Sequence, residues 1–300
     1  MEKKQIAFNK FYKSFNLVST FLIIISVLLL LFKGLNYGVD FKGGTLIELR
    51  ASDSQINIFK LRQSLLNMNL GDVNVKQFGN QNDYLIKIEK KNDSNPNFIQ
   101  EIKDDLIKSI GSGFNFRRVE NVGPKVSAEL LKSGIIAIGL SIAAMLFYIW
   151  IRFEWQFSLG AILALLHDVI ITLGVFSLFN FEINLSIVAA VLTIVGYSMN
   201  DTVVIFDRVR ENLKKYSDIK IFDLTNISIN ETLSRTIITS ITTLLALLSI
   251  YFLGGEILKG FSLAMILGVV FGTYSSIYIA NPILVLLKVS QSTILKEDKN

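Results

Sequence analysis

Residues 17–32 read Leu-Val-Ser-Thr-Phe-Leu-Ile-Ile-Ile-Ser-Val-Leu-Leu-Leu-Leu-Phe, a run without a single charged side chain. Such a run predicts a helix that crosses the hydrocarbon core of a bilayer. A basic segment precedes the run, but no cleavage site made of small residues follows it. We therefore interpret the run as a membrane anchor that is retained, and not as a cleaved signal peptide.

Further apolar blocks follow along the chain. Counted from the first, the blocks lie at 17–35, 134–151, 157–179, 185–206, 237–253 and 261–287. The chain of 300 residues is 51% hydrophobic and 18% charged, and its mean hydropathy is +0.48. A soluble protein needs more polar residues to cover its surface. The sequence therefore predicts an α-helical membrane protein with six transmembrane helices, the first at 17–37 and the others within 133–287.

The distribution of Lys and Arg predicts the orientation. Basic residues are concentrated in segments on one side of the predicted spans: the tail 1–16, the loop 207–235 and the tail 288–300. The opposite short loops, 180–184 and 254–260, hold a single basic residue, Lys259. By the positive-inside rule we expect both termini in the cytoplasm and the segment 38–132 on the outer side.

The composition also excludes several kinds of chemistry. The chain has no cysteine and one histidine, His167, which excludes disulfides, Cys nucleophiles and His-rich metal sites. We find no Gly-x-Ser-x-Gly elbow and no nucleophile–base set, so we expect neither an enzyme nor a bound cofactor. The net charge of +5 is expected to face anionic membrane lipids, and we predict no nucleic-acid partner.

The segment 38–132 predicts a folded domain between the first and second spans. Its pattern gives strands at 45–50, 73–78, 84–89 and 114–121, and helices at 54–68 and 96–110, the second capped by Asn95 with Pro96 in its first turn. This order, βαββαβ, is that of an α+β ferredoxin-like external domain. The fold carries no function of its own, and we expect the domain to bind or to act as a lever.

Polar residues inside the predicted spans are the candidates for chemistry. Asp201 lies in the fourth span, where an ionised carboxylate is costly unless it is paired or neutralised. Tyr197 and Ser198 lie on the same helical face as Asp201, and Asn200 is its neighbour in sequence. We interpret Asp201 as a proton carrier supported by these residues, with a structural hydrogen bond between helices as the alternative.

Two further polar groups lie in other spans. Arg235 opens the fifth span and is followed by Thr239 among several hydroxyl residues, which could line a hydrated path. By position alone Arg235 could equally be an interfacial anchor. His167 and Asp168 lie near the middle of the third span, and a lone pair of neighbours of this kind indicates satisfied packing more often than a proton relay.

Several stretches resemble the SecF branch of the SecD/SecF family of protein-export membrane proteins, within the resistance–nodulation–division superfamily. The stretches that carry the resemblance are Gly38–Thr45, Asn121–Pro124, His167–Gly174, Gly196–Asn212, Arg235–Ser240, Gly260–Leu263 and Gly272–Tyr278. They occur in the family's order from the first span to the last. The resemblance implies that Asp201 and Arg235 form an intramembrane proton-relay pair.

The resemblance also implies a function and partners. It implies an accessory subunit of the Sec translocase in the bacterial inner membrane, which uses the proton motive force to draw unfolded polypeptide out of the channel. The implied partners are SecD, the SecYEG channel and exported polypeptides, with protons as the coupling ion. The alternatives are a half-size small-molecule exporter of the same superfamily and a translocase scaffold that moves no protons.

Overall fold

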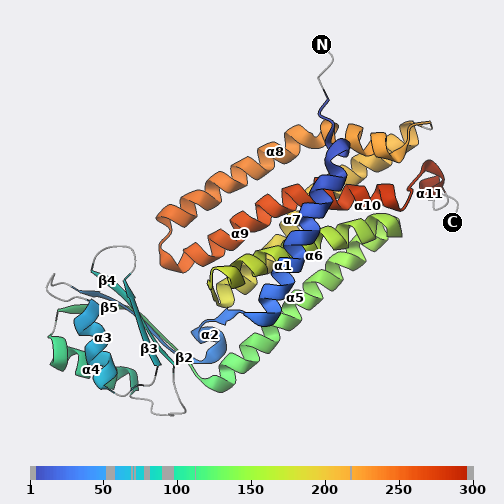
Figure 1. Cartoon of the computed structure of the whole chain (residues 1–300). Coiled ribbons are helices and arrows are strands. Elements are labelled where there is room, and N and C mark those ends of the chain that lie inside the picture. The colour runs from blue at the N-terminus through green and yellow to red at the C-terminus, as the bar shows by residue number, and fades with distance from the viewer. Residues whose placement is uncertain are drawn as a thin grey trace. The chain divides into compact units, whose positions relative to one another are not determined.

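The computed structural model in Figure 1 describes residues 5–51, 58–68, 70, 72–77, 82–89, 98–111, 113–216 and 218–295. The described part contains six helices that are long and apolar enough to cross a membrane. They are Phe8–Phe32, Pro124–Arg152, Trp155–Leu178, Leu185–Lys215, Ile221–Leu253 and Leu258–Leu286. The six transmembrane helices expected from the sequence are thus confirmed, and the chain is a multi-pass membrane protein.

The chain forms two compact units. The first, a helix bundle, comprises Met1–Asn36, Ile136–Glu182 and Ser186–Asn300, and the second, an α+β domain, comprises Tyr37–Ile135 and Ile183–Leu185. The long helices are α1 (Tyr12–Phe32), α5 (Pro124–Arg152), α6 (Trp155–Leu178), α7 (Leu185–Lys215), α8 (Ile221–Leu253) and α9 (Glu256–Ser275). The short elements of the bundle are η1 (Phe8–Phe11), η2 (Ser276–Ala280), α10 (Asn281–Leu286) and α11 (Gln291–Leu295).

The segment 207–235, expected as a cytoplasmic connection that begins as an extension of the fourth span or as a surface helix, is largely helical. α7 continues to Lys215 and α8 already begins at Ile221, so both helices extend well beyond the apolar blocks that predicted them. The tail expected at 1–16 also differs, because α1 starts at Tyr12. Hydropathy marks only the part of a helix that suits lipid, and these polar extensions are stabilised by contacts between helices.

α6, α7 and α9 form the buried centre of the bundle. Two glycines of α9 allow a close approach to α7: a Cβ on Gly268 would lie 2.3 Å from the side chain of Ile194, and a Cβ on Gly272 would lie 3.2 Å from the Cα of Ser198. The Gly-x-x-x-Gly spacing therefore brings the backbones of two helices together, as it often does in membranes.

The last span is not a uniform α-helix. After Ser275 the backbone forms the five-residue π-helix η2, and α10 then continues with a proline at its start. The amide of Asn281 donates a hydrogen bond of 2.7 Å to the carbonyl oxygen of Ser276. The widened turn follows directly on a run of hydroxyl residues in α9, and π-helical turns are frequent at functional sites.

The α+β domain has the expected ferredoxin-like order. Its elements are β2 (Gly44–Ala51), α3 (Ile58–Asn67), β3 (Asp72–Gln77), β4 (Asp83–Glu89), α4 (Phe98–Ile110) and β5 (Phe114–Val122). The strands form an antiparallel sheet in the order β3-β4-β2-β5, and both helices cover one face of it (Figure 1). Residues 54–57 of the first expected helix, and the cap formed by Asn95 and Pro96, lie outside the described residues.

Alternation along the strands builds the core of this domain. Ile47 and Leu49 of β2, and Ile86 and Ile88 of β4, are at most 1% exposed. They pack against Leu61, Leu65, Ile102 and Leu106 of the two helices. Successive residues of a strand point to opposite faces, so the apolar side chains of each strand gather on the face that the helices cover.

The paired glycines before β2 serve a steric purpose. Gly43 and Gly44 have φ angles of +81° and +144°, which residues with a Cβ rarely adopt. A Cβ on Gly44 would also lie 2.4 Å from the carbonyl oxygen of Ile88. The turn expected at these glycines is therefore present, and it follows a short helix, α2 (Val39–Lys42), that sequence reasoning missed.

A second small sheet was also missed. The strands β1 (Asn36–Tyr37) and β6 (Glu182–Ile183) pair with each other, although the residues lie far apart in sequence. Strands of two residues give no periodic signal, so only tertiary structure could reveal the pair.

Candidate intramembrane polar site

Asp201 lies on α7 and is 4% exposed. The hydroxyl group of Thr273, on α9, donates a long hydrogen bond of 3.4 Å to Oδ2 of Asp201. The hydroxyl groups of Thr273 and Ser240, on α8, are in turn 2.7 Å apart. Three helices therefore meet at this carboxylate through hydroxyl groups.

Arg235 lies at a similar depth but does not pair with Asp201. At about 1.5 Å per residue, Asp201 is about 24 Å from the Leu185 end of α7, and Arg235 is about 27 Å from the Leu253 end of α8. Both residues are described, and no nitrogen–oxygen distance of 4.0 Å or less joins them. Arg235 is exposed on the surface of the bundle. The expected ion pair is thus not formed in this structure.

The other supporting residues near Asp201 are in different environments. The hydroxyl group of Tyr197 is 3.4 Å from the carbonyl oxygen of Thr239, which links α7 to α8. The hydroxyl group of Thr239 donates to carbonyl oxygens of its own helix, those of Arg235 and Thr236. Asn200 is exposed on the surface of the bundle and does not turn toward Asp201.

A second buried carboxylate lies on α6. Asp168 is fully buried, and its Oδ2 accepts hydrogen bonds from the hydroxyl groups of Ser198 at 2.5 Å and Ser275 at 2.8 Å. Its Oδ1 is 2.8 Å from Nδ1 of His167. Ser198 thus bonds Asp168 of α6, although its helical face had placed it among the residues that support Asp201.

α9 connects the two carboxylates. Thr273 donates to Asp201, and Ser275, two residues further, donates to Asp168. Between them, the ring of Tyr274 stacks on the ring of His167 with centroids 5.8 Å apart. Sequence reasoning did not assign these α9 residues to the site, although the run Thr-Tyr-Ser-Ser inside an apolar span was a usable signal.

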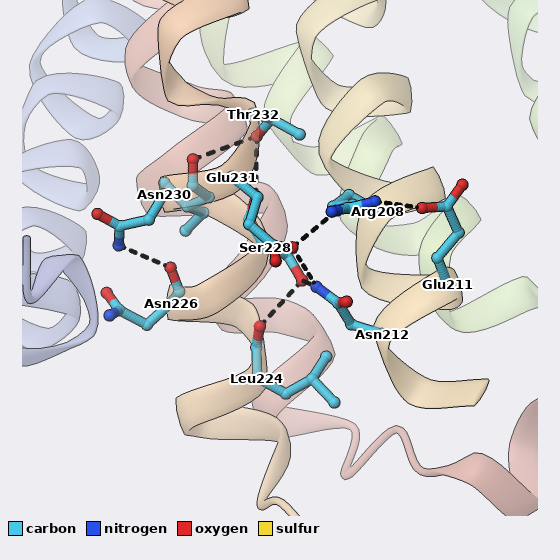
Figure 2. A network of polar contacts seen from close by, with 10 residues as sticks. Arg208, Glu211, Asn212, Leu224, Asn226, Ser228, Asn230, Glu231 and Thr232 are labelled. Carbon is cyan, nitrogen blue, oxygen red and sulfur yellow. Dashed lines mark hydrogen bonds and ion pairs between the residues drawn. The ribbon is translucent and has the colours of Figure 1, made fainter. Parts of the chain in front are cut away.

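A separate polar network links α7 and α8 toward the other end of these helices. Figure 2 shows Arg208 of α7 directed toward Glu231 of α8, with Nε 2.7 Å from Oε2. Arg208 also bonds Glu211 of its own helix at 2.7 Å. The amide nitrogen of Asn212 donates to Ser228 at 3.0 Å and to Glu231 at 2.7 Å. We call these five residues the α7–α8 network.

The side chains that this arrangement brings together are of types that can carry protons: carboxyl, imidazole and hydroxyl groups. Within the described residues, no group of three or more His, Cys, Asp or Glu side chains could hold a metal ion. Two buried carboxylates, an imidazole and several hydroxyl groups instead occupy the centre of a bundle whose helices can cross a membrane. Ionisable groups in such positions are rare and usually mark ion or proton pathways.

The fold and the site together define a polytopic membrane protein with buried carboxyl groups and an imidazole inside its helix bundle. The chain belongs to the SecD/SecF family of protein-export membrane proteins. Residues 102–290 match the family described as "Protein export membrane protein SecD/SecF, C-terminal", and residues 28–55 match the "SecD/SecF GG Motif". The second match contains the two glycines before β2.

Named relatives support the same assignment. The chain is 43% identical over 290 residues to the protein translocase subunit SecF of Cereibacter sphaeroides, covering 94% of this chain and 89% of the relative. It is 45% identical over 278 residues to the SecF of Rickettsia bellii, covering 91% of each.

Solved structures show the same fold. The crystal structure of SecDF, a translocon-associated membrane protein from Thermus thermophilus, matches with a TM-score of 0.84 and 35% identity, over 95% of this chain and 39% of that one. A SecDF structure in a super-membrane-facing form matches with a TM-score of 0.71 and 33% identity, over 100% of this chain and 41% of that one. This chain therefore spans about two fifths of the length of either SecDF chain.

Proposed function

We propose that the chain is an accessory subunit of the Sec protein translocase, which uses the proton motive force to promote export of unfolded polypeptide. The observation that carries the proposal is the buried carboxyl group of Asp201, which a long hydroxyl contact joins to Thr273 in the helix bundle of a SecD/SecF family member. The named relatives are translocase subunits, which favours protein export over small-molecule export.

Asp201 and Arg235 form the proton-dependent pair in this proposal. Ionised Asp201 attracts Arg235, and a proton on Asp201 removes that attraction. In this proposal, an open pair with Asp201 in contact with Thr273 is assigned to protonated Asp201. One charge crossing 100 mV supplies about 2.3 kcal/mol, which is comparable to the few kcal/mol that separate two conformers of a protein.

SecD is the proposed membrane partner. Arg235 and Asn200 are exposed at membrane depth, where a charged or amide side chain facing lipid is costly. A second subunit that covers this surface would remove the cost. The matched SecDF chains are more than twice as long as this one, so they have room for a second such unit. The SecYEG channel and the exported polypeptide are further proposed partners.

The orientation belongs to the proposal as well. Both termini and the connection between α7 and α8 are proposed to lie in the cytoplasm of the bacterial inner membrane, and the α+β domain outside. Because the chain lacks cysteine, Lys125→Cys and Asp218→Cys introduce single thiols at exposed positions. An impermeant reagent should label Lys125→Cys on cells with a permeabilised outer membrane, and Asp218→Cys only after lysis. The reverse result would contradict this orientation.

The function is tested by export into vesicles that contain the chain together with SecD and the channel, with and without an imposed proton gradient. Asp201→Asn should reduce gradient-stimulated export to the rate measured without a gradient, because the amide cannot exchange a proton. Thr193→Val is the matched control: Thr193 is an exposed hydroxyl residue on the same helix, bonded to the carbonyl oxygen of Ala189. Full stimulation of the Asp201→Asn variant would exclude proton coupling through Asp201.

A further inference from the structure

The neighbouring residues His167 and Asp168 have hydrogen-bond partners at every polar side-chain atom except one. Both side chains are completely buried, and Asp168 accepts bonds at both of its oxygen atoms. Within the described part of the chain, Nε2 of His167 is buried and has no hydrogen-bond partner. An unpaired polar atom in a buried site requires an explanation.

The number of protons on the His167–Asp168 pair decides which of their side-chain atoms lacks a hydrogen-bond partner. If Asp168 is ionised, it accepts three hydrogen bonds, one from Nδ1–H of His167, and the Nε2 lone pair is bare. This state places a net negative charge in a membrane bundle, which is unfavourable. One added proton at Nε2 gives an imidazolium–carboxylate pair without net charge. If the Nδ1 proton then moves to Oδ1, both side chains are neutral and Nε2 keeps the added proton.

The pair also lies on a definite side of Asp201. At about 1.5 Å per residue, Asp168 is about 15 Å from the Leu178 end of α6, whereas Asp201 is about 24 Å from the Leu185 end of α7. These two helix ends are joined by the short connection 179–184, so they lie on the same side of the membrane. A proton that enters from this side would reach the His167–Asp168 pair before Asp201.

We propose that His167 and Asp168 form a second proton-binding station of the transport cycle, located between Asp201 and the membrane side of the α6–α7 connection. The inference rests on the proposed function, because a proton pathway gives the station its role. Each cycle adds one proton to the pair at Nε2 of His167 and removes one proton again, so the number of protons on the pair returns to its starting value.

The station and Asp201 share contacts through α7 and α9. Ser198 bonds Asp168 and lies one helical turn from Asp201 on α7. Ser275 bonds Asp168, and Thr273, two residues away on α9, bonds Asp201. A change of charge at one carboxylate therefore affects the hydroxyl groups that donate hydrogen bonds to the other carboxylate.

The groups that face the station carry few charges. From α9 it faces Tyr274, whose hydroxyl group bonds Ser19 of α1 at 2.7 Å. Tyr278 of η2 packs on Tyr274 at 5.3 Å. α7 contributes Ser198 and, beyond it, Asp201. Among the described residues that face the station, Asp201 is the charged group that would sense its proton.

The single histidine makes the test direct. The full chain, labelled with ¹⁵N-histidine and purified through a tag without histidine, gives one pair of imidazole nitrogen signals in lipid nanodiscs. At high pH we expect a proton on Nδ1 and a bare Nε2. On acidification Nε2 should gain a proton in one transition. An Nε2 signal that stays unchanged over the pH range in which the protein remains folded would overturn the proposal.

Three variants separate this station from a structural role. Ser275→Ala removes one donor to Asp168, and Asp201→Asn removes a nearby titratable group, so both should shift the midpoint of the Nε2 transition. Thr172→Val is the matched control, because Thr172 is fully buried one turn from Asp168 and its hydroxyl group has no partner among the described residues. A midpoint that Asp201→Asn leaves unmoved would contradict the coupling.

His167→Gln tests the functional consequence in the export assay. It should reduce the stimulation by the gradient several-fold, with insertion and SecD binding retained. Normal export by His167→Gln would overturn the station while leaving the role of Asp201 intact. Full gradient stimulation of Asp201→Asn would instead reject the proposed function, whatever the NMR titration of His167 shows.

Discussion

α7 and α8 carry two pairs of oppositely charged residues, and only one of these pairs is formed. Arg208 of α7 and Glu231 of α8 form an ion pair of 2.7 Å within the α7–α8 network (Figure 2). Asp201 and Arg235, further along the same two helices, are not within 4.0 Å of each other although both are described. The signs are reversed between the pairs, since α7 contributes the cation to the first and the anion to the second.

The contrast between the formed and the unformed charge pair indicates where the separation of α7 and α8 can change. The formed pair is partly exposed, with Arg208 and Glu231 at 40% and 29% exposure, so water keeps both groups charged. Asp201 is buried, and an uncompensated charge there is costly, so its protonation state decides whether it attracts Arg235. Under the proposed function, two helices joined near one end and governed by a proton on Asp201, closer to their middle, act as a hinge.

Removing the cation of the unformed pair should have the largest effect. Arg235→Met should lower gradient-stimulated export to the unstimulated rate, because ionised Asp201 then has no partner to attract. Arg235→Lys retains the charge without the planar guanidinium group and should retain part of the stimulation. Export rates in reconstituted vesicles measure both variants. If the proton gradient stimulates export by the Arg235→Met variant as strongly as by the wild type, Asp201 and Arg235 do not act as a pair in export.

Breaking the formed pair should have a smaller effect, and one of a different kind. Glu231→Gln should lower the midpoint of thermal unfolding by a few degrees, since partly exposed ion pairs contribute about 0.2–1 kcal/mol. Gradient stimulation should remain above half of the wild-type value. The matched control is Glu211→Gln, which breaks a contact within α7 only and should change the midpoint less. If Glu231→Gln abolishes stimulation completely, the two pairs are not distinct in function.

The smallest effect on export is expected for a buried carboxyl group outside the membrane helices, which serves as a comparison with Asp201. Glu48 of β2 is 8% exposed, and burial raises the pKa of this carboxyl group, with Arg118 opposing. Because the pKa of Glu48 is higher in the folded state, its contribution to stability is present at low pH and is lost as the pH rises through that pKa. Hydrogen exchange of β2 in the full chain should show this loss.

Glu48→Gln should remove this pH dependence and leave gradient-stimulated export unchanged. A buried carboxyl group that lies outside the proposed proton pathway should affect local stability only. Loss of stimulation in Glu48→Gln would show that buried carboxyl groups affect export wherever they lie, and the contrast with Asp201 would fail.

The sequence predicted the architecture because the signals for it are periodic or long. Six apolar blocks gave the spans, and alternation in segments such as 84–89 gave the strands of the α+β domain. Hydropathy reports burial in lipid, so it could not show how far the polar extensions of α7 and α8 reach. Contacts such as Arg208 to Glu231, which stabilise these extensions, are visible only in three dimensions.

The site was predictable as a set of residues but not as a geometry. Asp201, Arg235, His167 and Asp168 are conspicuous because charged or polar side chains are rare in apolar spans. Their partners depend on which helices meet, and sequence cannot supply that. Ser198 therefore bonds Asp168 of α6, whereas Asp201 contacts Thr273 of α9. The roles of these residues in proton transfer stay predictions.

In the proposed function, a proton on Asp201 controls the separation of α7 and α8 near Arg235, while the α7–α8 network keeps the ends at Lys215 and Ile221 together. Spin labels attached to cysteines at the exposed positions Thr193 and Thr242 report on the first region, and labels at Lys215 and Asp223 report on the second. Distances are measured in nanodiscs containing the chain and SecD, between acidic and alkaline pH.

In the wild-type background, the distance between labels at Thr193 and Thr242 should change with pH, and the distance between labels at Lys215 and Asp223 should stay constant. In the Asp201→Asn background the first distance should stay fixed at its acidic value, because the amide mimics the protonated carboxyl group. A first distance that is independent of pH in the wild-type background, or that still changes with pH in Asp201→Asn, would contradict the account.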